Sequence, residues 1–397
     1  MNTKLFTAFI GILAASTSYA ELPHTFTANT PAKAYEVNSN FSNLDNRVTA
    51  IEAGQVNQIN LNCSSDPSSI NSALNSNFNK ILITSGICTV DPEFWLGPER
   101  FLEITGNGID SGFSSSVPFV VKSGTLHLID MQVYGNIQAK DGAHVFISST
   151  NITCSNLDKG ALGMWMSTAR IENNSFFSGC RGLDIRNGSA VKISDSIVDS
   201  AVDIKNLLIR EGSSVHAART EFRGSASTGS GHTNNQIDSN SRLSLVQNSS
   251  ITGNIYMNAS DLIMTDSSWY TDGSGLTKEI AAHRLSSLNI GQSQLGTGEI
   301  SMPYGGSFFF HSNSTITNNV NISLDTAPLF MSGSHSGNIS IYAVRSRVQL
   351  WEGNEIGTAT NTANIHIGDY STFGNGVTNY TGALTCADSK MHPDCPL

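Results

Sequence analysis

The chain has 397 residues and a formal net charge of −10, with 14% charged and 39% hydrophobic residues. A chain of this length holds two or three domains or one long repeat array. Its negative charge argues against nucleic acid or an anionic membrane as a partner.

Residues 1–20 have the pattern of a secretory signal peptide. A basic residue precedes an apolar run over 5–15, and Ser18 and Ala20 supply the small residues of a signal peptidase site. We therefore expect cleavage before Glu21 and export to the periplasm or the cell exterior, as from a bacterium. No later segment approaches the roughly 20 consecutive apolar residues of a membrane-spanning helix, so no transmembrane segment is predicted.

Residues 21–36 form a leader, and residues 37–54 have the spacing of a short coiled-coil helix. The heptad a and d positions are Val37, Phe41, Leu44, Val48 and Ile51. The segment from Arg47 to Glu52 resembles the Arg-φ-x-x-φ-Glu pattern of trimeric coiled coils. An isolated helix of this length is marginal in water, so we expect a homotrimer; the alternative is an amphipathic helix packed on its own domain. The predicted interface in this segment consists of Leu44, Arg47, Val48, Ile51 and Glu52.

Residues 55–122 are predicted to hold an N-terminal cap and the first coils of a repeat array. Asp66 suits a helix N-cap and Pro67 suits the first helical position, which predicts a second short helix. Its narrow apolar stripe consists of Ile70, Ala73 and Leu74. Such a helix would cover the open end of a β-solenoid, whose terminal strand otherwise exposes unpaired backbone groups.

A repeat runs through residues 123–383. Each copy has a small residue, two apolar residues at alternating positions, and a polar run rich in Ser, Asn and Asp. The first apolar residues of the copies are Leu126, Val145, Ala169, Val191, Val215, Leu243, Leu262, Leu288, Phe308, Leu329 and Val348. These positions recur on average every ~22 residues. A period in this range indicates a solenoid or another repeat architecture.

Two or three short strands with turns in each repeat correspond to one coil of a parallel β-helix. A β-propeller is the main alternative, but its blades need ~40 residues and four antiparallel strands. Residues 63–383 resemble the right-handed parallel β-helix of the pectin-lyase-like superfamily. The resemblance rests on the predicted cap helix, the Ile-Leu-Ile-Thr-Ser-Gly start at 81–86, the Gly-Asn-Gly turn at 106–108 and the repeats. We predict an all-β protein with about 11 or more coils.

Six cysteines in an exported chain favour disulfide bonds. Six cysteines allow 15 connectivities, and pairing of sequence neighbours gives one of them. These pairs are Cys63–Cys88, Cys154–Cys180 and Cys386–Cys395. The second pair is separated by about one coil and would join adjacent coils, and the third would close a tail over 384–397. No Cys-x-x-Cys pair or His cluster is present in the sequence, which argues against zinc.

Stacking of the coils predicts that cations gather on the first half of the solenoid. Arg170, Lys192 and His216 would follow one another on successive coils, and cations ~5 Å apart repel unless carboxylates or an anionic ligand neutralise them. A groove for an acidic polysaccharide is the functional interpretation. Its predicted ligand-binding residues are Lys140, Trp165, Arg170, Arg210 and His216. The alternative is an intramolecular salt-bridge lattice that uses Asp141, Glu172, Asp184, Asp195 and Glu211.

The second half of the solenoid is predicted to carry an apolar outward row. Ile263, Phe309 and Phe330 fall at related positions of their repeats. Exposed apolar rows are unusual on a monomer. We predict that they belong to the subunit interface of the trimer; the alternative is a loop folded over this face.

The arrangement of carboxylate residues is the main sequence evidence for or against an enzyme that cleaves polysaccharides. The resemblance implies, for an enzyme, a polysaccharide lyase or a glycoside hydrolase. The aspartate pairs and Gly-His-Gly segment of polygalacturonases are not found; the nearest fragment, at 231–233, is Gly-His-Thr. The densest patch for a lyase consists of Asp184, Arg186, Lys192 and Asp195. We predict a non-catalytic, cofactor-free extracellular or surface protein that binds glycan; the alternative is a lyase or hydrolase of an acidic polysaccharide, with calcium only for a lyase.

Overall fold

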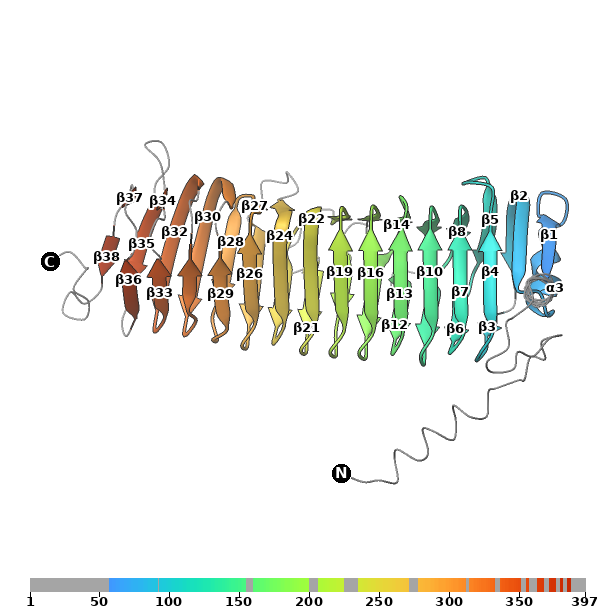
Figure 1. The fold of residues 1–397 in the computed structure, drawn as a ribbon, viewed down its shortest axis with the longest axis horizontal. Helices are drawn as coiled ribbons and strands as arrows, with labels where there is room; N and C mark the ends of the chain where they lie inside the picture. Colours follow the sequence, from blue (N-terminus) through green and yellow to red (C-terminus); the bar gives the residue numbers. More distant parts are fainter. Residues whose placement is uncertain are drawn as a thin grey trace, which may run out of the picture. The chain divides into compact units, whose positions relative to one another are not determined.

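The computed structural model describes most of the repeat region of the chain (Figure 1). The described residues are 57–91, 93–154, 160–199, 206–224, 235–270, 278–311, 314–332, 336–350, 355–356, 363–367, 371–375, 379–380 and 384–386. The predicted signal peptide, leader and coiled-coil helix lie outside them. The predicted residues that therefore have no structural description are Leu44, Arg47, Val48, Ile51, Glu52 and Cys395.

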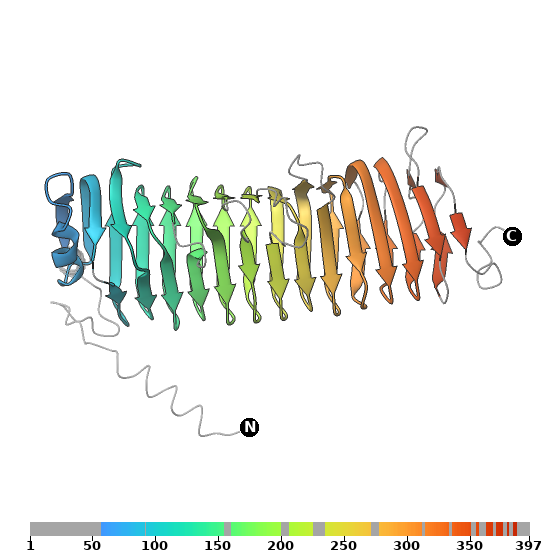
Figure 2. The same ribbon diagram turned by 180° about the vertical axis from the view of Figure 1, so that it is seen from behind.

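Short strands stack in register along the chain and form a parallel β-solenoid of about 12 turns (Figures 1 and 2). Every strand pair in the described residues is parallel, and each strand pairs with its equivalents on the coils before and after it. The all-β parallel solenoid predicted from the repeat is therefore confirmed, and the propeller alternative is wrong. The strands of most coils lie on three faces, which we name face 1, face 2 and face 3 in chain order.

Face 1 consists of β3 (Trp95–Leu96), β6 (Phe119–Lys122), β9 (Ile137–Lys140), β12 (Gly160–Trp165), β15 (Arg181–Arg186), β18 (Leu207–Ile209), β21 (Asn235–Asp238), β23 (Ile255–Asn258), β25 (Lys278–His283), β28 (Gly298–Met302), most of β30 (Thr315–Asp325) and β32 (Ser336–Val344), β35 (Ala363–Ile367) and β38 (Leu384–Cys386).

Face 2 begins with β1 (Gln58–Asn62) and the start of β2 (Lys80–Val90) and continues through β4 (Phe101–Thr105), β7 (Thr125–Ile129), β10 (His144–Ser148), β13 (Thr168–Glu172), β16 (Ala190–Ser194), β19 (Ser214–Ala218), the first parts of β22 (Arg242–Thr252) and β24 (Asp261–Tyr270), β26 (Ser287–Gly291), β29 (Ser307–Phe310), β31 (Leu329–Met331), β33 (Arg347–Leu350) and β36 (Thr372–Asn375).

Face 3 consists of the end of β2, β5 (Ser111–Ser115), β8 (Gln132–Tyr134), β11 (Asn151–Thr153), β14 (Phe176–Ser178), β17 (Ile197–Asp199), β20 (Glu221–Arg223), the ends of β22 and β24, β27 (Gln294–Leu295) and the first residues of β30 and β32. The remaining pair is β34 (Glu355–Ile356) with β37 (Asn379–Tyr380).

The inward side chains form continuous apolar rows. On face 2 the predicted first apolar residues pair coil by coil, from Leu126 opposite Val145 to Leu329 opposite Val348. All of them belong to one buried core. Burial of an aliphatic side chain contributes roughly 1.5–3 kcal/mol, so the stack repeats this contribution on every coil.

Serine residues occupy the corner between face 1 and face 2. They stand two positions before the first apolar residue in seven of the eleven copies, whereas Gly124, Ala143, Gly306 and Ala327 stand there in the other four. Several of the serine hydroxyls accept a hydrogen bond from a backbone N–H of the coil before. Ser167 N–H donates to Ser189 Oγ (3.1 Å), Ser189 N–H to Ser213 Oγ (3.2 Å) and Ser213 N–H to Ser241 Oγ (3.3 Å). A residue with positive φ, such as Met166, precedes the serine and turns the chain. Where a serine stands at this corner, its hydroxyl thus satisfies a buried amide of the coil before it.

The helix α3 (Ser69–Leu74) lies at the β1 end of the stack (Figure 1), and its stripe of Ile70, Ala73 and Leu74 is buried. The predicted N-cap was wrong. The cap is Ser68, and Asp66 lies two residues earlier, where its carboxylate accepts hydrogen bonds from the backbone N–H and the hydroxyl of Ser68. The Asp66 side chain therefore closes an Asx-type turn instead of the helix end.

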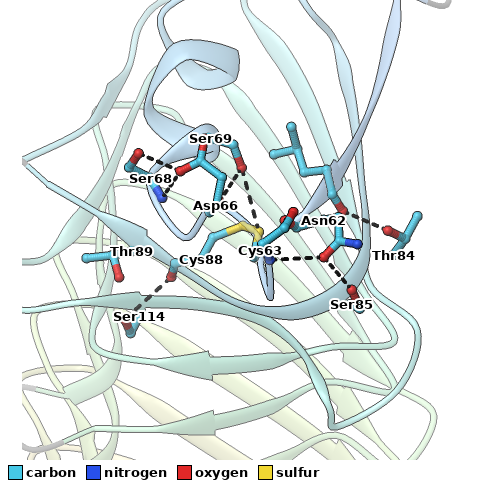
Figure 3. The surroundings of a disulfide bond; sticks show 12 residues. Asn62, Cys63, Asp66, Ser68, Ser69, Thr84, Ser85, Cys88, Thr89 and Ser114 are labelled. Atoms are coloured by element: carbon cyan, nitrogen blue, oxygen red, sulfur yellow. Dashed lines mark hydrogen bonds between the residues drawn. A yellow bond between two sulfur atoms is a disulfide. The ribbon is translucent and has the colours of Figure 1, made fainter.

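Two of the three predicted disulfides are present. Cys63–Cys88 lies beside α3, with the Ser69 hydroxyl 4.0 Å from Cys63 Sγ (Figure 3). Cys154–Cys180 joins adjacent coils as predicted, with a Cα–Cα distance of 5.6 Å. The ladder reaches into the predicted tail, because β38 ends at Cys386 and pairs with β35.

The serine corner generates a stability prediction. Ser213→Ala removes the acceptor of the Ser189 N–H in a corner where Ser213 is 1% exposed. A buried donor left without its partner costs about 1–3 kcal/mol, so the free energy of unfolding should fall by that amount in a denaturant titration. The matched control is the adjacent, half-buried Ser214, whose replacement by Ala should change it little. Equal losses in the two variants would contradict the role given to the corner hydroxyl.

Candidate functional site

The outward side chains of face 2 form a row that changes character along the solenoid. Strand register places Glu103, His127, Phe146, Arg170, Lys192 and His216 on successive coils. The predicted succession of Arg170, Lys192 and His216 is therefore present. The row is aromatic at His127 and Phe146 and cationic from Arg170 onward.

A groove of about 240 Å³ opens on the outer side of β7, β10 and β13. One wall is the row of His127, Phe146 and Arg170, and the other is a parallel row of Thr125, His144 and Thr168. Between the walls lie the inward-facing residues of the same strands. Outward residues two positions apart stand ~6.6 Å apart along a strand, so the space between their rows is a trough that crosses the strands.

The two walls differ in chemistry. Ring centroids lie 4.9 Å apart for Phe101 and His127 and 5.1 Å apart for His127 and Phe146. The Arg170 guanidinium lies 6.0 Å from the Phe146 ring centroid. On the opposite wall, His144 Nδ1 and Thr168 Oγ1 are hydrogen-bonded at 2.6 Å. The groove therefore offers an aromatic surface that ends in a cation on one side and hydrogen-bonding groups on the other.

Partial burial lowers the pKa of His127, and the carboxylate of Glu103 on the preceding coil opposes this shift without reversing it. The imidazole of His127 is therefore neutral at neutral pH and adds no charge to the aromatic wall.

The cations next to the groove are available to an anion. Arg170 contacts Glu172 at 2.6 Å, but its side chain is 68% exposed, and an exposed pair of this kind is worth at most about 1 kcal/mol. Lys192 and His216 are exposed, and neither has an ion-pair partner within the described part of the chain. A carboxylate or sulfate could therefore reach all three side chains at little cost.

Face 1 carries the other predicted cations, and there they are satisfied internally. Lys140, Trp165 and Arg186 stand opposite one another on successive coils. The Trp165 ring lies against Gly163, where an added Cβ would come within 2.9 Å of it, and Lys140 Nζ lies 5.4 Å from the ring centroid. Arg186 Nε and Nη2 contact the buried carboxylate of Asp184 at 2.6 and 2.8 Å. This hydrogen-bonded pairing raises the pKa of Arg186.

The predicted ligand-binding residues are divided between two faces. Lys140, Trp165 and Arg210 lie on face 1 or at its edge, whereas Arg170 and His216 lie on face 2, and of the five only Arg170 lines the groove. His127 and Phe146, which also line the groove, are not among the predicted site residues. Sequence reasoning missed the opposite wall of Thr125, His144 and Thr168. The period-2 alternation contained this signal, since these residues stand two positions before the row.

The salt-bridge lattice considered as the alternative is largely present. Lys122 and Asp141 lie 3.6 Å apart, and Arg210 and Asp238 lie 3.4 Å apart. Arg219 donates two hydrogen bonds, of 2.6 and 2.8 Å, to the carboxylate of Asp195, and these bonds lower the pKa of that carboxyl. Like charges stacked on neighbouring coils are thus neutralised by carboxylates over much of the surface.

The four predicted catalytic candidates lie in three separate places. Asp184 and Arg186 form a pair on face 1, Lys192 stands on face 2, and Asp195 lies in the turn between β16 and β17, bound to Arg219. In the described residues, no group of three or more His, Cys, Asp and Glu side chains is arranged to hold a metal ion.

The predicted apolar row exists in register. Ile263, Asn289, Phe309 and Phe330 follow one another on face 2. The rings of Phe309 and Phe330 stack at 5.0 Å, and the Arg347 guanidinium lies 5.7 Å from the Phe330 ring. All three apolar side chains are half-buried.

Comparisons with protein-family models, with curated proteins and with solved structures found no match to the chain. Among the described residues, no helix combines the length and hydropathy needed to cross a membrane.

Neutral His127 generates a prediction for stability against pH. Its lowered folded-state pKa means that the unfolded chain binds a proton near its ordinary pKa of about 6.5 while the folded chain does not. Stability should therefore be highest above that pH and fall as the pH drops towards the folded-state pKa. His283, whose pKa is also lowered, adds to this fall.

His127→Gln should reduce the loss of Tm between about pH 7.5 and about pH 5.5, measured by thermal melts followed by circular dichroism. His216→Gln, at an exposed position of the same row, is the control and should melt like the wild type. Parallel melting curves for all three proteins would show that His127 does not set the pH dependence.

Proposed function

We propose that the protein is an exported, non-catalytic binding protein that holds an acidic glycan on face 2. The observation that supports this most directly is the groove between His127, Phe146 and Arg170 on one side and Thr125, His144 and Thr168 on the other. The cations Lys192 and His216 continue the first wall beyond the groove.

The spacing of the solenoid suits a linear saccharide. Successive coils rise by ~4.8 Å, which is close to the advance of one sugar unit in an extended glycan. The apolar face of one ring would pack on His127 and Phe146, and its hydroxyls would reach Thr125, His144 and Thr168. Carboxylates or sulfates of the following units would meet Arg170, Lys192 and His216 in charge-assisted hydrogen bonds.

Two features of the chain support export from the cytoplasm. Two cysteine pairs at disulfide distance are typical of proteins from oxidising compartments, and the N-terminal sequence has the signal-peptide pattern described above. A free or surface-bound protein outside the cytoplasm would meet acidic polysaccharides directly.

The finer architecture belongs to the same proposal. We assign the solenoid to the right-handed type of the pectin-lyase-like superfamily. The segment 37–54 would trimerise the chain, with the row of Ile263, Phe309 and Phe330 packed against a neighbouring subunit.

The mature protein should elute as a particle of three chain masses in size-exclusion chromatography with light scattering. Deleting residues 37–54 should shift it to a smaller mass, because the coiled coil would supply most of the association. Phe309→Asp together with Phe330→Asp should weaken association further, by placing charges in the proposed interface. A single-chain mass for the intact mature protein would contradict the trimer.

The binding proposal is tested with arrays that carry uronate-containing and sulfated glycans. Loss of a charge-assisted hydrogen bond costs about 1.5–3 kcal/mol, so Arg170→Ala should weaken binding roughly 10- to 100-fold. Phe146→Ala should weaken it by a similar factor through loss of the aromatic wall.

Arg242 is the matched control, since it also stands outward on face 2, is 58% exposed and contacts Asp261 at 2.9 Å. Arg242→Ala should bind like the wild type. Uniform loss in Arg170→Ala and Arg242→Ala would indicate a non-specific charge effect and contradict the groove. An absorbance increase from unsaturated uronate on incubation with an acidic polysaccharide, abolished by Arg186→Ala, would instead establish the lyase alternative.

A further inference from the structure

A second and larger groove, of about 350 Å³, lies on face 3 over β20, β22, β24 and β27. Its central row is fixed by strand register, with Glu221, Ser250, Ser268 and Gln294 on successive coils. None of these residues belongs to the face 2 groove, and the sequence patterns did not single them out.

The two edges of this groove come from different parts of the coil. Asn248 and Asp266 have φ of 62° and 50° and belong to the turns that lead from face 2 to face 3. On the other side stands Tyr270, 40% exposed, whose hydroxyl is 3.2 Å from Gln294 Oε1. The groove thus has an amide and carboxylate edge, a hydroxyl floor and an aromatic edge.

The polar groups of the groove are available for a ligand. Within the described residues, the side chains of Asn248, Ser250, Asp266 and Ser268 have no hydrogen-bond or ion-pair partner. Together they supply donors and acceptors in mixed order along the groove. A ligand with many hydroxyl groups matches such a surface, because each hydroxyl both donates and accepts.

The charge of this groove is opposite to that of face 2. Its ionisable lining residues are the carboxylates of Asp266 and Glu221, of which Glu221 contacts Arg223 at 2.5 Å. Among the residues that the structure describes, no lysine, arginine or histidine lines it. An acidic glycan would therefore be repelled here, whereas an uncharged one would not.

We propose that the face 3 groove binds a neutral saccharide, with one sugar ring against Tyr270 and its hydroxyls on the row from Ser250 to Gln294. The aromatic ring would take the apolar face of the sugar, as expected for a tyrosine with one exposed side. This site is independent of the acidic-glycan groove and stands even where that proposal fails.

The test uses the full mature chain with three neutral probes, namely hexamers of α-1,4-glucose, β-1,4-glucose and N-acetylglucosamine. Saturation-transfer NMR and calorimetry should detect binding of at least one probe to the wild type. Tyr270→Ala should weaken that binding about tenfold or more, because it removes the ring against which the sugar packs. Tyr270→Phe and Gln294→Ala should give smaller losses, since each keeps the ring.

Tyr134 provides a matched control. Like Tyr270, it follows the inward residue of its face 3 strand, and it is 46% exposed, but it does not line the groove. Tyr134→Ala should bind the neutral probe like the wild type, and so should Arg170→Ala. The proposal would be overturned if none of the three probes bound the wild type. It would also be overturned if Tyr270→Ala had the circular dichroism spectrum of the wild type and bound the probe equally well. Loss of neutral binding in Tyr270→Ala with retained acidic-glycan binding separates this site from face 2.

Discussion

The structure depends on one geometric constraint, which is that every coil repeats the backbone of the coil before it. Parallel pairing satisfies the amides of the straight segments, but a turn points some N–H groups along the solenoid axis into the corner. At the corner between faces 1 and 2 these groups donate to serine hydroxyls of the next coil, as in the chain from Ser167 through Ser189 and Ser213 to Ser241. Where a serine hydroxyl accepts such a bond, an alanine in its place would leave the amide of the preceding coil without that acceptor, although other coils carry Gly124, Ala143, Gly306 or Ala327 at the same position.

The same constraint governs the surface. Outward side chains are held ~4.8 Å from their equivalents on neighbouring coils, so two like charges in one row repel strongly unless a counter-charge lies nearby. The pairs Arg186–Asp184 and Arg219–Asp195 solve this locally. Lys192 and His216 have no ion-pair partner within the described residues, and they adjoin the face 2 groove. A ligand that carries negative charges at a similar spacing would supply the counter-charge.

The sequence predicts the parts of this structure that alternation and period control. The inward row from Leu126 to Val348 and the outward row from His127 to His216 both follow from counting residues in each repeat. Prediction fails where a turn resets the alternation. Trp269 is completely buried and its Nε1 donates a hydrogen bond to the Gly253 carbonyl, because Asp266, with φ of 50°, turns the chain between Met264 and Trp269. The two grooves could not be predicted from the sequence either. Residue spacing does not determine side-chain geometry, which decides how tightly a carboxylate holds Arg170 or Arg186.

Inward and outward positions have separate energetic roles in such a fold. Leu126 and Leu128 are 0% exposed and belong to the core, whereas the neighbouring His127 packs against the outward rings of Phe101 and Phe146 on adjacent coils. A face can therefore acquire or lose a groove without altering the stack that supports it. This explains how face 2 can present aromatic rings and cations while face 3, on the same coils or a few coils away, presents hydroxyls, amides and carboxylates. Under the two proposals, one solenoid would bind an acidic glycan on face 2 and a neutral glycan on face 3.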